Sequence, residues 1–181
     1  MIKALYNYRE LLKSNIKKEI RGKYKGSFLG ILWSFVNPLL SVLVYALVFP
    51  FILKNSPDNY LVYLIVGILP WTFFTTVINQ GTFTILGNAG IIKKVYFPRE
   101  ILPISVVASG LVNFMISCII ILIFLFLTGI GLSWYILLFP FIILIQCILS
   151  LGIIFITGAI NVYVRDAEYI ITFILNMLFY A

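Results

Sequence analysis

The chain has 181 residues, of which 62% are hydrophobic and only 10% are charged, and its formal net charge is +7. A soluble domain of this size could not cover its surface with so few charged side chains, so the soluble globular classes are excluded. Apolar runs longer than about 18 residues recur along the sequence and predict an all-α polytopic membrane protein; a β-barrel would instead show short alternating strands. Because the chain has no histidine, and its two cysteines lie inside separate apolar runs, we expect no metal site.

The positive charge is concentrated at the start of the chain. Eight of the 13 Lys and Arg residues lie in the first 25 positions, directly before an apolar run. Such a cluster is typical of a cytoplasmic flank attracted to anionic lipid, and it favours this role over a nucleic-acid-binding arm. We therefore expect a membrane partner and no nucleic acid.

Residues 2–21 place apolar side chains on one face of a helix and most of the cations on the other. The apolar face consists of Ile2, Leu5, Tyr8, Leu12, Ile16 and Ile20. The pattern predicts an N-terminal amphipathic helix in the membrane interface, with packing on a partner protein as the alternative. We expect residues 1–27 to form this cytoplasmic helix and the loop that leads into the membrane, and residues 28–181 to form the membrane domain.

Four apolar runs are long enough to cross a bilayer completely. They cover residues 28–53, 61–86, 104–128 and 134–160. A fifth run begins near residue 169 and continues for only about a dozen residues, which is too short to cross. We expect the start of a fifth transmembrane helix here, in a membrane domain that is C-terminally incomplete.

The remaining charges predict the orientation. With the N-terminus in the cytoplasm, the loop at 87–103 adds three cations to that side and Arg165 adds another, whereas the outer loops hold only Lys54. The four spans contain no Asp, Glu, Lys or Arg, which argues against proton-coupled transporters and voltage sensors. The chain also lacks a phosphate-binding Gly-rich loop and has no pair of carboxylates at membrane depth for acid–base chemistry, so we expect no enzyme activity, and any energy source must lie elsewhere.

Two predicted cytoplasmic loops contain aromatic or charged residues that a simple connecting loop would not need. The first combines aromatic and charged side chains, which suits a docking surface for a partner protein; an interfacial aromatic belt is the alternative. Its candidate docking residues are Lys93, Lys94, Val95, Tyr96, Phe97, Pro98, Arg99 and Glu100, with both aromatic rings expected to be exposed. The second loop contains Arg165, Asp166 and Glu168, which a solvated helix start explains equally well.

Within the spans, several aromatic side chains are candidates to line a conduit for sugars, because their faces pack against the apolar faces of pyranose rings. They are Tyr45, Phe49, Trp71, Phe73 and Phe74, with lipid-facing or helix-packing positions as the alternative. The amides of the spans are expected to bond between helices in preference to binding substrate. These amides are Asn37, Asn79, Gln80, Asn113, Gln146 and Asn176.

Three segments together resemble the ABC-2-type polysaccharide exporter permeases, the membrane subunits that export O-antigen, teichoic acid and related lipid-linked glycans. The first resembles the motif at which the chain enters the membrane, through Arg21, Tyr24, Lys25, Ser27, Leu29, Gly30, Trp33 and Pro38. Residues 88–103 resemble the family's first ATPase-coupling segment, and residues 161–166 resemble the second. All three occur in the family's order, over the whole of the chain.

The resemblance implies a single ABC-2-type transmembrane domain over residues 1–181, in a homodimer with two separate ATP-binding subunits. ATP and magnesium would lie on those subunits, so no cofactor is expected in this chain. The coupling segments would transmit their motion, and a lipid-linked glycan would cross the bacterial cytoplasmic (inner) membrane. Family members continue through a full fifth span, two re-entrant helices and a sixth span.

Two other functions remain open at this point. An ABC-2 permease for small hydrophobic compounds belongs to the same superfamily. A membrane-embedded enzyme of lipid-linked sugar metabolism would need titratable groups near the bilayer surface, and Arg165, Asp166 and Glu168 are the compact candidates.

Overall fold

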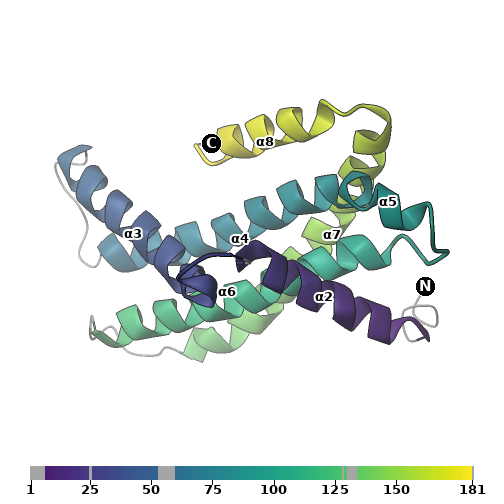
Figure 1. Ribbon diagram of the computed structural model, residues 1–181. Coiled ribbons are helices and arrows are strands. Elements are labelled where there is room, and N and C mark those ends of the chain that lie inside the picture. Colours follow the sequence, from purple (N-terminus) through teal and green to yellow (C-terminus); the bar gives the residue numbers. More distant parts are fainter. Residues whose placement is uncertain (1–6, 25, 53–59, 128, 130–133, 181) are drawn as a thin grey trace.

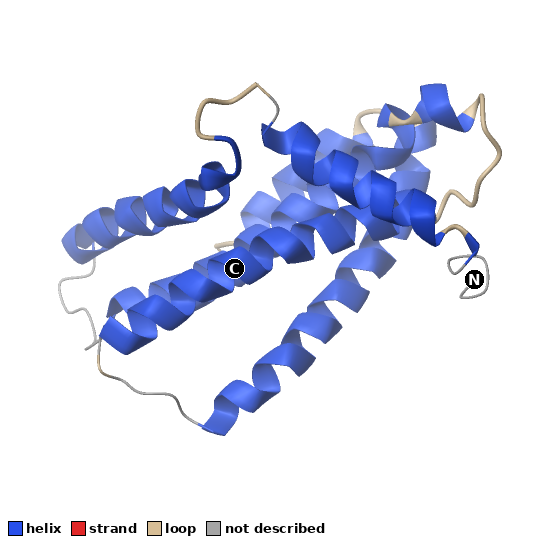
Figure 2. Ribbon diagram, turned by 60° about the horizontal axis from the view of Figure 1, so that its bottom comes forward, coloured by secondary structure: helices blue, strands red, loops and turns tan. Residues whose placement is uncertain are grey.

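A computed structural model describes residues 7–24, 26–52, 60–127, 129 and 134–180, and these form helices and connecting loops without strands (Figure 2). Three of the helices are long and apolar enough to cross a membrane: α4 (Tyr60–Gly87), α6 (Ile101–Leu127) and α7 (Phe139–Tyr163). The last of these is preceded by the short 3₁₀ helix η2 (Trp134–Leu138). The all-helical membrane class is therefore confirmed, and these helices match the spans expected at 61–86, 104–128 and 134–160.

The first predicted span corresponds to helix α3 (Trp33–Ile52), which begins later than the expected residue 28. Two glycines delay the start, because Gly26 and Gly30 adopt φ angles of 81° and 48° that interrupt a right-handed helix. A 3₁₀ turn, η1 (Gly30–Leu32), then leads into α3. Whether α3 completes a fourth span stays a prediction.

The N-terminal helix α2 (Arg9–Tyr24) crosses α6 obliquely at the end of the bundle that carries α5 (Ala89–Ile92) (Figure 1). Two residues of the predicted apolar face, Tyr8 and Leu12, were expected on lipid but pack, together with Leu11, against a cluster that includes Ile101 and Leu102 of the same chain. Ile2 and Leu5 lie outside the described residues. The reason is that the start of α6 offers apolar side chains that a free interfacial helix would not meet.

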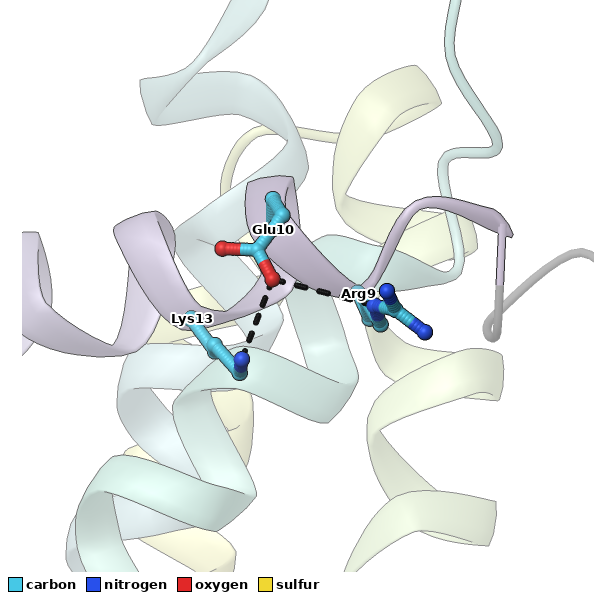
Figure 3. Close-up of polar contacts among 3 residues, drawn as sticks. All are labelled: Arg9, Glu10 and Lys13. Atoms are coloured by element: carbon cyan, nitrogen blue, oxygen red, sulfur yellow. Dashed lines mark hydrogen bonds and ion pairs between the residues drawn. The ribbon is translucent and has the colours of Figure 1, made fainter.

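The outer face of α2 carries a small group of exposed charges (Figure 3). The Lys13 ammonium donates to the Glu10 carboxylate at 3.0 Å, and the Arg9 guanidinium lies 3.7 Å from the same carboxylate. Exposed ion pairs contribute only about 0.2–1 kcal/mol each to stability. Apolar packing on α6 therefore contributes more to the position of α2.

The most central helix is α4, which contacts α3, α6, α7 and α8 (Ala167–Leu178). Its pairing with α7 uses small and polar residues: the two hydroxyls of Thr82 and Thr157 lie 2.8 Å apart, and the Asn161 amide donates to the Thr82 carbonyl at 3.2 Å. Further along, the Gln146 amide donates to the Pro70 carbonyl at 2.8 Å. Close approach and interhelical hydrogen bonds are how helices associate in lipid, where apolar burial gives little preference for protein over lipid.

The C-terminal helix α8 turns back from α7 and runs beside α4 in the opposite direction (Figure 1). The Thr172 hydroxyl donates to the Asn79 side-chain carbonyl at 3.0 Å, and the Trp71 and Phe179 rings lie 6.0 Å apart. This helix corresponds to the fifth run expected from residue 169. Its direction back along α4 is the direction that a fifth membrane segment would take.

Candidate functional site

An open cavity of about 330 Å³, which we call the span cavity, lies between α3, α4 and α6. Although it lies among helices free of charged residues, its lining includes seven polar side chains: Asn37, Ser41, Thr72, Thr76, Gln80, Asn113 and Ser117. Three aromatic rings, those of Trp33, Phe73 and Phe114, complete the wall. A lining of this composition can hold a polar ligand at membrane depth.

A second cavity, of about 390 Å³, lies beneath α2 and is called here the α2 cavity. Helix α2 contributes Lys18, Glu19 and Gly22, and residues of α4 and α6, together with Asn88 after α4, supply the rest of the wall. Gln80 and Asn113 line both cavities. The two cavities therefore adjoin, and together they form a polar groove from the surface near α2 into the middle of the spans.

The groove follows from the spacing of polar residues on two helices. On α4 they recur at Thr72, Thr76 and Gln80, and on α6 at Ser109, Asn113 and Ser117. Side chains four residues apart lie on the same face of an α-helix, so each helix presents a polar stripe. The stripes come together because α4 and α6 pack side by side.

Most hydroxyl groups of the groove donate to their own helix. Thr72 donates to the Ile68 carbonyl at 2.8 Å, and Ser109 donates to the Val106 carbonyl at 2.9 Å. Such a bond uses the proton of a hydroxyl and leaves oxygen lone pairs that can accept. The groove therefore presents acceptors to a ligand that is rich in hydroxyl donors.

Of the aromatic residues predicted to line a conduit, some line the groove and others pack elsewhere. Phe73 lines the span cavity, where its ring stacks on that of Phe114 at a centroid distance of 5.0 Å. Trp71 instead pairs with Phe74 and Phe179 on the side of α8, so Trp71 and Phe74 do not line the groove. The side chains of Tyr45 and Phe49 lie outside the described residues.

The motif that leads into the membrane lies beside the span cavity. The Trp33 indole N–H donates to the Ser27 hydroxyl at 2.8 Å, which fixes the turn that contains the half-buried Leu29 and the left-handed Gly30. Trp33 and Pro38 both line the cavity. Arg21 is exposed on α2, whereas Lys25 and the side chain of Tyr24 lie outside the described residues.

The predicted first coupling segment differs from the expectation in one respect. Lys93, Lys94, Val95, Tyr96, Arg99 and Glu100 are exposed, and Pro98 is half-buried. The Tyr96 ring is 95% exposed, but Phe97, also expected to be exposed, is only 8% exposed. Neighbouring side chains point in different directions here, and the Phe97 ring meets Leu11 and Leu12 of α2, which cover it. Phe97 is therefore a packing residue between the segment and α2, and Tyr96 is the exposed aromatic.

The predicted second coupling segment lies at the same end of the bundle, in the turn between α7 and α8 (Figure 1). Arg165 and Asp166 are exposed, Glu168 is half-buried, and the intervening Ala167 is buried. These three charged residues are thus brought to the end that also carries Lys93 and Tyr96.

The amides of the spans follow two patterns. Gln146 and Asn79 take part in bonds between helices, as expected. Asn37, Gln80 and Asn113 line the groove, a position that the expectation of bonds between helices did not include. The four-residue spacing of polar positions was the signal in the sequence that identifies this face.

Comparison with known proteins gives a consistent result. Residues 10–181 match the family model described as ABC-2 type transporter. An O-antigen export system permease protein RfbA from Myxococcus xanthus is 38% identical over 181 residues, which cover 100% of this chain and 70% of the relative. A protein of the same name from Klebsiella pneumoniae is 35% identical over 184 residues, covering 99% of this chain and 71% of the relative.

Proposed function

The chain belongs to the ABC-2 type transporter family, and from this premise we propose that it is the permease subunit of an ATP-driven exporter of a lipid-linked polysaccharide. The observation that carries the proposal is the polar groove within spans that contain no charged residue. Relatives similar over nearly the whole chain are named for O-antigen export, which supports a cell-surface glycan as cargo. The chain is a multi-pass membrane protein of the cytoplasmic membrane in this proposal, with its N-terminus in the cytoplasm.

The groove suits a glycan in two ways. Its amides and hydroxyls match the many donors and acceptors of sugar rings, and the half-buried Trp33 ring on its wall offers an apolar face. A small hydrophobic compound would gain little from seven polar side chains, and burying them against it would cost free energy. The groove therefore favours the glycan over the permease for small hydrophobic compounds.

The polar face also supports a homodimer. Asn37, Thr72 and Gln80 are exposed in the single chain, although they belong to apolar helices. Polar groups facing lipid cost free energy because the hydrocarbon offers no hydrogen-bond partner. A second copy placed over this face would shield these groups and enclose a path between two symmetric walls.

The energy would come from a separate ATP-binding subunit. Tyr96 is an exposed aromatic flanked by Lys93 and Lys94, and aromatic rings with nearby charges are typical anchors of a protein interface. Arg165 and Asp166 would extend this surface across the turn between α7 and α8. The bonds of Thr82 to Thr157 and Asn161 join α4 to α7, so both segments would move with one helix pair.

Replacement of Gln80 by leucine tests the groove. The change removes an amide shared by both cavities, and loss of one hydrogen bond worth about 0.5–1.5 kcal/mol corresponds to as much as about a tenfold loss of export. In the host, surface glycan should fall and lipid-linked glycan should accumulate in the cytoplasmic membrane.

Tyr63→Leu is the matched control, because Tyr63 is an exposed residue of the same helix that lines neither cavity. Equal amounts of both variants in the membrane would show that each inserts. Normal surface glycan in a strain that lacks this chain altogether would refute the proposed function.

A further inference from the structure

We propose that the α2 cavity is a binding subsite for one neutral sugar ring of the substrate, and that Lys18 and Asn88 form the latch that closes it. The inference rests on the proposed function, because a sugar ring would reach this cavity as part of a lipid-linked glycan. The proposed subsite lies within a single subunit, at the mouth of the groove. The bond between Lys18 and Asn88 would let the coupling segment open the α2 cavity.

The wall of the cavity carries mainly neutral hydrogen-bonding groups. Gln80 and Asn113 supply amides, Thr84 and Ser109 supply hydroxyls, and Phe83 adds an aromatic ring. An amide can donate and accept at once, and a hydroxyl that donates to its own helix still accepts. A sugar ring combines hydroxyls on its edge with apolar C–H faces, so this set of groups matches it.

The charges in the lining argue against an anionic headgroup as the occupant. Among the described residues that line the cavity, the charged ones are Lys18 and Glu19, and their signs are opposite. A diphosphate would gain from the ammonium group and lose to the neighbouring carboxylate, whereas a neutral ring can hydrogen-bond to both. The volume of about 390 Å³ lies within the range of ligand pockets, at roughly 300–1,000 Å³.

The latch joins α2 to the start of the coupling segment. The Lys18 ammonium donates to the Asn88 side-chain carbonyl at 2.9 Å, and the Asn88 amide donates to the Thr84 carbonyl at 2.8 Å. Through these two bonds Asn88 links α2 to α4 across the mouth of the cavity. Because Asn88 immediately precedes α5, a displacement of that segment acts directly on this bond.

A second contact holds α2 to the same segment. Phe97 is buried against Leu11 and Leu12 of α2, at the far end of the loop that begins after Asn88. The coupling segment therefore contacts α2 through a hydrogen bond at one end and through an apolar cluster at the other. Motion of the segment would move α2 as a whole and open or close the α2 cavity.

Gly22 offers a direct way to fill the cavity without disturbing the fold. It lines the cavity, and a Cβ built on it meets no atom within 4 Å. Gly22→Leu should therefore leave α2 intact while occupying the space of the sugar ring, and export should fall several-fold. Gly152→Leu is the matched control, because Gly152 is exposed on α7 with equally open space and lies outside both cavities.

Occupancy can be measured by cysteine labelling of the complete transporter in inside-out vesicles from the host. Cys118 and Cys147 are first replaced by alanine, and a single cysteine is placed at Phe83, which lines the cavity and is 47% exposed. A membrane-impermeant maleimide should label Phe83→Cys several-fold more slowly in vesicles from cells that synthesise the lipid-linked glycan than in vesicles from cells that do not. Ser14→Cys, at an exposed position of α2 that lines neither cavity, should label equally in both.

Lys18→Met tests the latch in the same vesicles. Loss of the bond to Asn88 should raise the labelling rate of Phe83→Cys in the absence of glycan. Equal labelling of Phe83→Cys with and without glycan, or export by Gly22→Leu equal to that of Gly152→Leu, would overturn the subsite. If those results appear while the unmodified chain still supports export, the proposed function stands and only the subsite is refuted.

Discussion

Phe97→Ala tests how the proposed coupling segment is attached to α2. The ring is 8% exposed and packs with Leu11 and Leu12 of α2 and with Leu102 at the start of α6. Truncation of a buried phenylalanine to alanine costs about 3–5 kcal/mol. We expect a value near the lower end, about 3 kcal/mol, because the α2 partners are themselves half-buried and can close partly over the gap.

A loss of this size has a measurable effect on α2. Since 1.4 kcal/mol is a tenfold change in an equilibrium constant, about 3 kcal/mol raises the undocked population of α2 roughly a hundredfold. Hydrogen exchange of the backbone amides of Arg9–Tyr24, read by mass spectrometry on the purified protein, should accelerate by a similar factor when local opening limits exchange. Exchange in α4 and α7 should not change.

The neighbouring residue supplies the control. Tyr96 is 95% exposed, so Tyr96→Ala should leave the exchange of α2 unchanged and should instead weaken binding of the ATP-binding subunit. Unchanged exchange in Phe97→Ala would show that the ring does not hold α2 in place. Faster exchange in Tyr96→Ala would contradict the assignment of Tyr96 to an external interface.

Two further predictions concern the pairing of α4 with α7. Gly81→Ala places a methyl group 2.6 Å from side-chain atoms of Ile154, so overpacking should destabilise the helix pair by about 1–3 kcal/mol. The thermal unfolding temperature in detergent should therefore fall for Gly81→Ala and stay unchanged for the control Gly152→Ala. Equal unfolding temperatures of the two variants would refute the close contact. Asn161→Leu removes the hydrogen bond to the Thr82 carbonyl and should lower the free energy of unfolding by about 0.6–1.7 kcal/mol, measured in denaturing detergent. A stabilised variant would show that this bond does not hold α4 and α7 together.

The polar groove shows where the sequence was informative and where the prediction stopped. Thr72, Thr76 and Gln80 recur every four residues, so a polar stripe on α4 was present in the pattern. The pattern did not say which neighbour the stripe faces, and the amides were assigned to bonds between helices. That prediction is confirmed for Gln146, whose amide reaches Pro70, and Asn113 lines the groove, a position that the pattern did not indicate.

The adjacent residues Tyr96 and Phe97 illustrate the same limit at the charged end. Both are aromatic and both lie in a basic loop, so composition gives them the same role. Their exposures differ because α2, which precedes them by more than 70 residues in sequence, covers only one of the two rings. A contact between segments so distant cannot be inferred from the local pattern of either.

The sequence by itself determined the class of this protein, the positions of its apolar helices and the absence of charge within them. These properties depend on the transfer of each side chain between water and lipid, which is a property of the residue and its near neighbours. Only the tertiary structure decided that α2 packs on α6, that the stripes of α4 and α6 enclose a groove, and that Lys18 reaches Asn88. These outcomes depend on the rotation and crossing of helices around one another, which are set by packing among residues far apart in the chain.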